Sequence, residues 1–245
     1  MRSLAITGSG VVSGLGVGLS DFHGALDSRA PDALQLSGPV EGIPDGLAAG
    51  FELVAVRDFD ARDFLGKKGL RNFDRLTCML IVSVREALEQ AGIKAEGAFR
   101  HFDAREVGLC TATAFGSLAS ITETNRVVEL ENPRFINPSR FPNTVINSAS
   151  GHASIWEELR ALNVTLVDGQ TGPIDALLSA SIHLDAGRAR ALVVVGADEI
   201  SEAQLVAWRR LAGRRVPRLG EGAASLVVEA LEGARKRGAC ILGQV

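Results

Sequence analysis

The sequence predicts an α/β protein with a mostly parallel β-sheet that is covered by helices on both faces. The first observation is that short apolar runs alternate with helical segments along the whole chain, which is typical of such sheets. The second is the length of 245 residues, with 46% hydrophobic and 22% charged residues, which suits one sizeable domain with its own core. No internal repeat and no low-complexity linker divides the chain.

Apolar runs flanked by turn residues predict the strands. The first run ends at Gly8-Ser9-Gly10, which is expected to form a tight turn. The predicted strands are Leu4–Thr7, Glu106–Thr111, Val164–Asp168, Ala191–Val195 and Ala224–Glu229, with Ala239–Val245 as a possible sixth.

Helical periodicity is clearest in the segment that begins after Asn72 or Asp74, either of which can cap a helix, and that ends near Gln90. Its apolar residues recur at helical spacing: Leu76, Leu80, Val84, Ala87 and Leu88. The other predicted helices cover residues 18–28, 117–130, 142–159 and 172–186. Residues 29–59 are rich in Gly, Pro and Asp and are expected to form a surface excursion.

Composition excludes several classes of protein. The net charge of −3 gives no overall signature of nucleic-acid binding. No apolar run approaches the roughly 18 residues needed to cross a bilayer. The three cysteines lack metal-ligand spacing and are predicted to be buried thiols in a reducing compartment. We therefore expect a cytoplasmic protein with no metal, no membrane and no nucleic-acid partner.

The glycine-rich stretch Gly8 to Gly14 resembles a dinucleotide-binding fingerprint only in part. That motif requires glycine or alanine where this chain has Ser13, and no acidic strand end follows about 20 residues later. No cofactor is predicted, and a nicotinamide-dependent reductase is the weakest alternative.

Six segments in order resemble the β-ketoacyl synthase family, which has a thiolase-like fold. They are LAITGSGVVSGLGVGLSDFHGAL near the N-terminus, FDARDFLGKKGLRNFDRLTCMLIVSVREALEQAGI, EVGLCTATAFGSLASITETNR, FPNTVINSASGHASIWEEL, RARALVVVGADEI and GEGAASLVVEALEGARKRGACILGQV. The resemblance implies the N-terminal half of that fold, as a single domain over residues 1–245 without the C-terminal half. It also implies a mostly parallel five-stranded sheet in the order 3-2-1-4-5.

The nucleophile position is where the chain departs from the family. The family places a cysteine on a sharp turn before a helix, and the matching position here is Gln170. A carboxamide cannot form an acyl thioester. The resemblance is therefore to chain-length-factor subunits of type II polyketide synthases, which pair with an active ketosynthase. It implies that this chain alone is not an enzyme, whereas the complex is a β-ketoacyl-ACP synthase in polyketide, polyene or fatty acid-like biosynthesis.

The family's two catalytic histidines belong to the C-terminal half, and none of this chain's four histidines matches them: His23, His101, His152 and His183. The helix after Gln170 should be apolar all round in the full fold. Here we expect one apolar face (Ile174, Leu177, Leu178, Ile182) and one polar stripe (Asp175, Ser179, His183).

The resemblance also implies partner surfaces. The strand Val164–Asp168 should be a sheet edge that pairs with a ketosynthase in a heterodimer or with a second copy in a homodimer. Residues expected at that interface are Phe141, Asn143, Val145, Val164, Leu166 and Asp168. Residues that would plug the acyl tunnel are Leu118, Ile121 and Asn125, for which core packing or solvent exposure is the other interpretation.

Two basic clusters suit an acidic partner. Lys67, Lys68 and Arg71 lie where related ketosynthases receive the acyl carrier protein. A second cluster is expected in a loop before GEGA: Arg209, Arg210, Arg214, Arg215 and Arg218. Both could equally be solvated surface.

Two other functions stay open on the sequence. One is a homodimeric module that binds acyl chains or carrier protein without a ketosynthase partner. The other is an enzyme of different chemistry that uses Asp168, Asp175 or His183 as an acid–base group.

Overall fold

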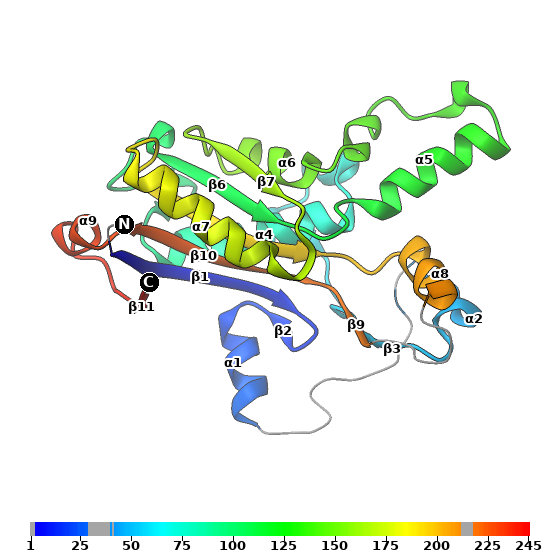
Figure 1. Ribbon diagram of the computed structural model, residues 1–245, viewed down its shortest axis with the longest axis horizontal. Helices are drawn as coiled ribbons and strands as arrows, with labels where there is room; N and C mark the ends of the chain where they lie inside the picture. The colour runs from blue at the N-terminus through cyan, green and yellow to red at the C-terminus, as the bar shows by residue number, and fades with distance from the viewer. Residues whose placement is uncertain (1–2, 29–39, 41, 212–217) are drawn as a thin grey trace.

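A computed structural model of the 245-residue chain describes residues 3–28, 40, 42–211 and 218–245 (Figure 1). Its main sheet is seven-stranded, with β2 attached to β1 and the other strands in the order β11-β1-β10-β8-β6-β7. The strands are β1 (Leu4–Ser13), β2 (Gly16–Val17), β6 (Val107–Ala112), β7 (Asn163–Leu166), β8 (Ala191–Asp198), β10 (Gly222–Ala230) and β11 (Gly243–Gln244). Two small sheets pair β3 (Glu52–Val54) with β9 (Arg218–Gly220) and β4 (Lys94–Ala95) with β5 (Ala98–Phe99).

The α/β prediction is confirmed, but the sheet is mixed and its strand order differs from the expected one. Strand β6 runs parallel to β7 and β8, whereas β10 is antiparallel to both β8 and β1. When the five predicted strands are numbered in chain order, their observed order across the sheet is 3-2-4-5-1. Strand β10 returns antiparallel beside β8, and β1 then pairs with its free side. Alternation of strands and helices gives element types but not neighbours, so this return was not visible in the sequence.

Helices cover both faces of the main sheet, as predicted (Figure 1). On one face α4 (Arg75–Gln90) packs along β1, β10 and β8, with α6 (Ser148–Trp156) beside it. On the other face lies α7 (Gly172–Asp185). Alternate residues of β8 point to the two cores: Val193 and Val195 to the α4 side, Leu192 and Val194 to the α7 side.

The remaining helices lie around this framework. They are α1 (Leu19–Asp27), α2 (Asp45–Ala48), α3 (Ala61–Leu65), α5 (Leu118–Leu130), α8 (Glu202–Leu211) and α9 (Leu231–Lys236). Short 3-10 turns are η1 (Leu70–Asn72), η2 (Ala104–Glu106), η3 (Pro133–Phe135), η4 (Phe141–Thr144) and η5 (Gly169–Thr171). No helix in the described residues is long and apolar enough to cross a membrane.

The first strand does not end at Thr7, and the predicted glycine turn is wrong. Strand β1 continues through Gly8 and Gly10 to Ser13. The two glycines instead let β1 approach α4 closely: a Cβ on Gly10 would lie 2.1 Å from the Ser83 carbonyl oxygen, and one on Gly8 would lie 2.2 Å from that of Ala87. The Ser83 hydroxyl donates to the Gly10 carbonyl oxygen at 3.0 Å.

Three other segments differ from the sequence prediction. The helix expected over 142–159 is split, because η4 precedes it and α6 begins only at Ser148. Arg209 and Arg210 lie on the unpredicted helix α8 and Arg218 begins β9, so these three do not form a loop; Arg214 and Arg215 lie outside the described residues. Of the predicted strand Ala239–Val245, only β11 is regular strand, with backbone hydrogen bonds to β1 from Leu242 to Val245.

The predicted apolar face of α7 is split, because Leu177 packs on the sheet side whereas its other members lie on the outer side. The buried side of α7 consists mainly of small residues, including Ala176 and Ala180. Its outer side carries an apolar stripe at i, i+4 and i+8, with exposed fractions of 71% for Ile174, 49% for Leu178 and 55% for Ile182. The close fit of small residues against β6 and β8 turns the large side chains outward. The predicted polar stripe of Asp175, Ser179 and His183 is half-buried between these two sides.

The contact between β1 and α4 predicts that Gly10→Ala destabilises the fold. The added methyl group overlaps the Ser83 carbonyl oxygen, so strand and helix must separate, at a cost of about 1–3 kcal/mol. Urea unfolding of both proteins measures this. The control Gly24→Ala in α1 meets nothing within 4 Å and should be neutral or slightly stabilising. Equal urea midpoints for Gly10→Ala and wild type would contradict the packing argument.

Candidate functional site

The turn between β7 and α7 holds Gln170, as the sequence predicts. Gly169 takes a left-handed φ of 58°, and the 3-10 turn η5 leads directly into α7. The Thr171 hydroxyl donates to the Asp168 carbonyl oxygen at 3.1 Å and tightens the turn. Gln170 is exposed at the N-terminal end of a 14-residue helix, where backbone N–H groups favour an oxygen atom or an anion.

A cavity of about 610 Å³ opens beside this turn. It lies between the start of α7 and the ends of β6, β8 and β10. Gly169 and Pro173 line it from the turn, but the side chain of Gln170 does not. Its wall is mostly apolar, with polar groups from Thr113, Asp198 and Glu221. We call it the turn cavity.

Asp198, at the end of β8, organises the loop that follows β6. Its carboxylate accepts from the backbone N–H groups of Ala114, at 3.0 Å, and Phe115, at 3.2 Å. It also accepts from the Thr113 hydroxyl at 2.8 Å, and the Gly116 N–H donates to that hydroxyl oxygen in turn. One carboxylate thus fixes the whole segment that leads into α5 and forms a wall of the turn cavity.

The neighbouring Glu199 binds two helices at once. Its Oε2 atom accepts from the backbone N–H of Leu76 in α4 and its Oε1 atom from that of Ala119 in α5, both at 3.2 Å. Burial, together with the negative charge of Asp74, raises the pKa of Glu199 to about 7. Asp74 caps α4 by accepting from the Thr77 N–H, and it accepts from the Ser120 hydroxyl of α5.

Glu221, between β9 and β10, is the third buried acid at this end of the sheet. Its carboxylate pairs with Arg75 at 2.7 Å and accepts from the backbone N–H groups of Val56 and Ile200. The three acids Asp198, Glu199 and Glu221 therefore connect β8 and β10 to the starts of α4 and α5.

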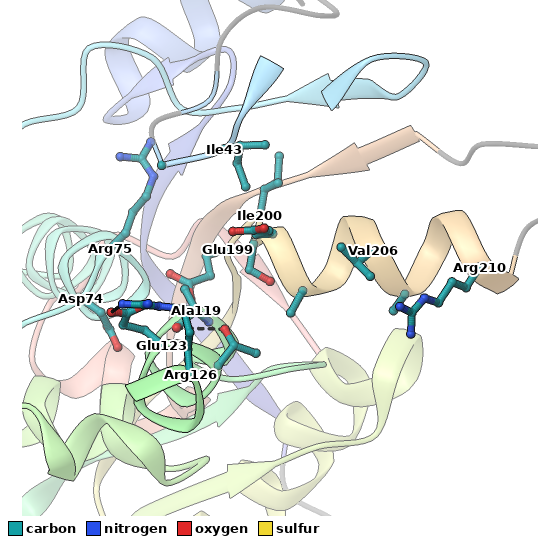
Figure 2. A pocket seen from close by; sticks show the side chains of 16 residues that line it. Ile43, Asp74, Arg75, Ala119, Glu123, Arg126, Glu199, Ile200, Val206 and Arg210 are labelled. Carbon is teal, nitrogen blue, oxygen red and sulfur yellow. Dashed lines mark hydrogen bonds and ion pairs between the residues drawn. The ribbon is translucent and has the colours of Figure 1, made fainter. Parts of the chain in front are cut away.

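A second cavity, of about 660 Å³, lies between α5 and α8 (Figure 2). We call it the helix cavity. Figure 2 shows Asp74 and Glu199 together toward one end of it and Arg210 at the far end of α8. Its apolar wall includes Ala119 and Ile200. Among the described residues, no group of three or more His, Cys, Asp or Glu side chains is arranged to hold a metal ion.

The structure separates some of the predicted site residues. On α5, Leu118 and Ile121 are half-buried and Asn125 is exposed, but none of the three lines the turn cavity or the helix cavity. Instead, α5 contributes Ala119 and Thr122 to the helix cavity. Lys67, Lys68 and Arg71 are exposed around η1, as a docking surface requires.

The predicted interface residues fall into two groups. Phe141 and Val145 are exposed, and Asp168 is exposed while Val164 and Leu166 are half-buried on or beside β7, an edge of the main sheet. Asn143 is buried instead: its side-chain amide donates to the Asn72 carbonyl oxygen at 2.7 Å, and its Oδ1 accepts from Ser148 and contacts His152. Within the chain, Asn143 therefore holds η1 and α6 together.

The alternative acid–base group is not assembled. Asp175 and His183 are eight residues apart on α7, which separates them by about 12 Å along the helix axis. His183 instead contacts the Arg188 guanidinium at 3.3 Å. Burial raises the pKa of both the Cys78 and Cys110 thiols to about 11, whereas Cys240 is exposed, contrary to prediction.

Sequence reasoning missed Asp198, Glu199 and Glu221 as site residues. A usable sign was present, because Asp198 and Glu199 directly follow a buried apolar strand, where acids need specific partners. Those partners lie about 80 and 120 residues away, so the pattern alone could not identify them.

The chain belongs to the β-ketoacyl synthase family. Residues 1–214 match the family model "Beta-ketoacyl synthase, N-terminal domain". The chain is 30% identical to 3-oxoacyl-[acyl-carrier-protein] synthase 2 of Coxiella burnetii, across all of this chain and 62% of that protein. It is 29% identical to the Rhizobium meliloti protein of the same name, across all of this chain and 63% of that one.

Among solved structures, the chain resembles "The ishigamide ketosynthase/chain length factor" with a TM-score of 0.79 and 26% identity, covering 94% of this chain and 63% of that one. The thiolase-like ketosynthase fold predicted from the sequence is thus confirmed. The chain spans somewhat less than two thirds of the length of the curated relatives it matches.

The prediction that this chain is not an enzyme is wrong. Its curated relatives are named as synthases, which are enzymes. That prediction relied in part on the absence of two catalytic histidines, which the family carries in its C-terminal half. Because the relatives extend well beyond the stretch matched here, the argument from missing histidines does not hold.

The Asp198 network predicts that Asp198→Asn destabilises the chain by about 1–3 kcal/mol. All three donors reach the Oδ1 atom, and a neutral amide oxygen accepts these hydrogen bonds more weakly than a carboxylate, while the new NH2 group faces the Ala114 N–H. Chemical unfolding measures the difference from wild type. The matched control is Asp175→Asn at the start of α7, with an expected change below about 0.5 kcal/mol. Equal losses in the two variants would refute the anchoring role of Asp198.

Proposed function

We propose that this chain is a ketosynthase-like subunit of the chain-length-factor type. It pairs with an active β-ketoacyl synthase in bacterial type II polyketide, polyene or fatty acid-like biosynthesis, and the two-chain complex carries out the condensation. Similarity over 94% of the chain to a ketosynthase/chain length factor supports this proposal. The observation that carries it is the unpaired edge of β7, which is set among exposed apolar side chains.

The surface around β7 has the composition of a protein interface. Strand β7 pairs only with β6 in the described part of the chain, so its outer backbone groups are available to another strand. Large apolar side chains are exposed along the segment from η4 into α6, and α6 packs beside β7: Phe141, Val145, Ile146 and Ile155. Two more, Leu130 and Phe135, are exposed at the end of α5 and on η3, and α5 extends away from the sheet (Figure 1). Exposed apolar groups in such number indicate a protein partner.

Within the complex we assign Gln170 to the position that matches the family nucleophile. On this chain, the start of α7 supports Gln170 in holding a carbonyl oxygen through backbone N–H donors. Lys67, Lys68 and Arg71 are proposed to receive an acidic acyl carrier protein. The unpaired thiols Cys78, Cys110 and Cys240 favour the cytoplasm as the compartment.

Co-expression with the ketosynthase encoded nearest to this gene tests the pairing. Size-exclusion chromatography with mass determination should give a one-to-one complex whose condensation activity depends on both chains. A lone homodimer that ignores every ketosynthase offered would reject the pairing and favour an acyl- or carrier-binding module.

The edge of β7 predicts a selective loss of pairing in Thr165→Pro. The Leu162 and Leu166 carbonyl oxygens accept from β6, so by alternation the Thr165 N–H points to the open edge. Proline removes this donor without breaking the β6 ladder. Size-exclusion mass should then show separate chains.

Thr165→Val is the control for that variant, since it keeps the N–H and removes only a buried hydroxyl that has no hydrogen-bond partner. It should pair as the wild type does. Wild-type pairing by Thr165→Pro would reject β7 as the interface.

We assign Leu118, Ile121 and Asn125 to the plug of the acyl tunnel. This assignment predicts longer products for Ile121→Ala in the complex. A smaller side chain on the half-buried face of α5 leaves room for about one more two-carbon unit. Mass spectrometry of the products measures the shift. Val128→Ala, near the exposed end of the same helix, is the control. An unchanged product distribution for Ile121→Ala would remove this residue from the tunnel.

A further inference from the structure

Glu199 occupies an unusual place between two helices. It is 4% exposed and follows β8 directly. Leu76 is the second residue of α4 and Ala119 the second of α5, and each donates its backbone N–H to a different oxygen of the same carboxyl group. These N–H groups have no partner within their own helices. One side chain therefore caps both helices and fixes their first turns relative to each other.

The surroundings of this carboxyl group are mainly acidic. Asp74 and Glu221 both disfavour its negative charge. The nearest cations are engaged elsewhere, because Arg75 pairs with Glu221 and Arg126 pairs with Glu123 and Glu131. In the described part of the chain no ion pair joins Glu199 to a cation. Among the residues that the structure describes, the charged groups around it are Asp74, Arg75, Glu123, Arg126, Asp198, Glu202, Arg210 and Glu221.

We propose that Glu199 is a positioning residue that holds the first turn of α5 against that of α4, and that the proton on its carboxyl group controls how firmly α5 is held. When the group is ionised, its charge lies beside Asp74 and Glu221 with little water to screen it. An arrangement in which the start of α5 moves outward and admits water relieves this cost.

The direction follows from linkage. With α5 in place the pKa of Glu199 is about 7, because burial and the charge of Asp74 outweigh the two backbone N–H groups, which favour the ionised form. When water reaches the group, its pKa falls toward the ordinary value of 4.5. A raised pKa means that the protonated group favours the docked helix. Docking is therefore strongest below about pH 4.5, weakens as the pH rises from there to about 7, and changes little above that.

The strength with which α5 is attached to the rest of the fold therefore depends on pH up to near neutrality. Helix α5 forms one wall of the helix cavity, through Ala119 and Thr122. It also carries Leu118 and Ile121, to which we assign control of product length. That last step rests on the proposed function; the attachment of α5 by Glu199 does not.

Amide hydrogen exchange of the full chain, followed by mass spectrometry between pH 6 and 8.5, tests the attachment. After correction for intrinsic exchange rates, protection of the first turn of α5 should fall about tenfold across this range, as expected for one group with a pKa near 7. In Glu199→Gln, which has no ionisable proton, protection should not change with pH. Glu202→Gln removes an exposed charge from the same cavity and should keep the wild-type slope.

A flat profile in the wild type would overturn the proposal without any variant, and so would a wild-type slope in Glu199→Gln. A second measurement keeps the two proposals apart. In a ketosynthase complex, product length should vary with pH for the wild type and not for Glu199→Gln. Failure to form any such complex would reject the proposed function, whereas the exchange profile would still decide the role of Glu199.

Discussion

The arrangement at the end of β8 and β10 depends on buried carboxylates that serve backbone N–H groups far away in the sequence. Asp198, Glu199 and Glu221 accept from the loop after β6, from the first turns of α4 and α5, and from Val56 and Ile200. Helix starts and irregular loops leave such donors without partners, and a buried donor without a partner is costly. Both cavities lie at this end, so their walls are set by three acidic side chains.

The sequence predicted those parts of the fold that local periodicity determines. The strands and helix α4 are found close to their expected positions, because apolar spacing and the Asp74 cap are local features. The order of the strands was mispredicted, because nothing local specifies that β1 pairs with β10. Gly8 and Gly10 were misread for the same reason, because their role is to let a strand meet a helix 73 residues away in the sequence, counted from Gly10 to Ser83.

The candidate site was predictable to a smaller extent. The family resemblance led to Gln170, which does lie on a sharp turn before α7. Composition could not show which side of α7 is buried, because alanines fill the narrow space against the sheet while Ile174, Leu178 and Ile182 remain outside. Asn143 illustrates the same limit, since a residue expected at an interface is engaged inside its own chain.

The exposed apolar side chains of the described chain include two groups, one from η4 into α6 beside β7 and one along the outer face of α7. The first carries an open strand edge and is the basis of the proposed pairing. The second leaves the outer side of this helix open to contact with further protein. Together they describe a ketosynthase domain whose exposed surfaces are suited to contact with further protein.

The measurement that tests the central claim most directly is a structure, by crystallography or electron microscopy, of the chain copurified with a ketosynthase. We predict that β7 continues into the partner's sheet, with the Thr165 N–H bonded across the interface and with Phe141 and Val145 covered. A complex in which β7 stays open to solvent, while the partner contacts another face, would contradict it.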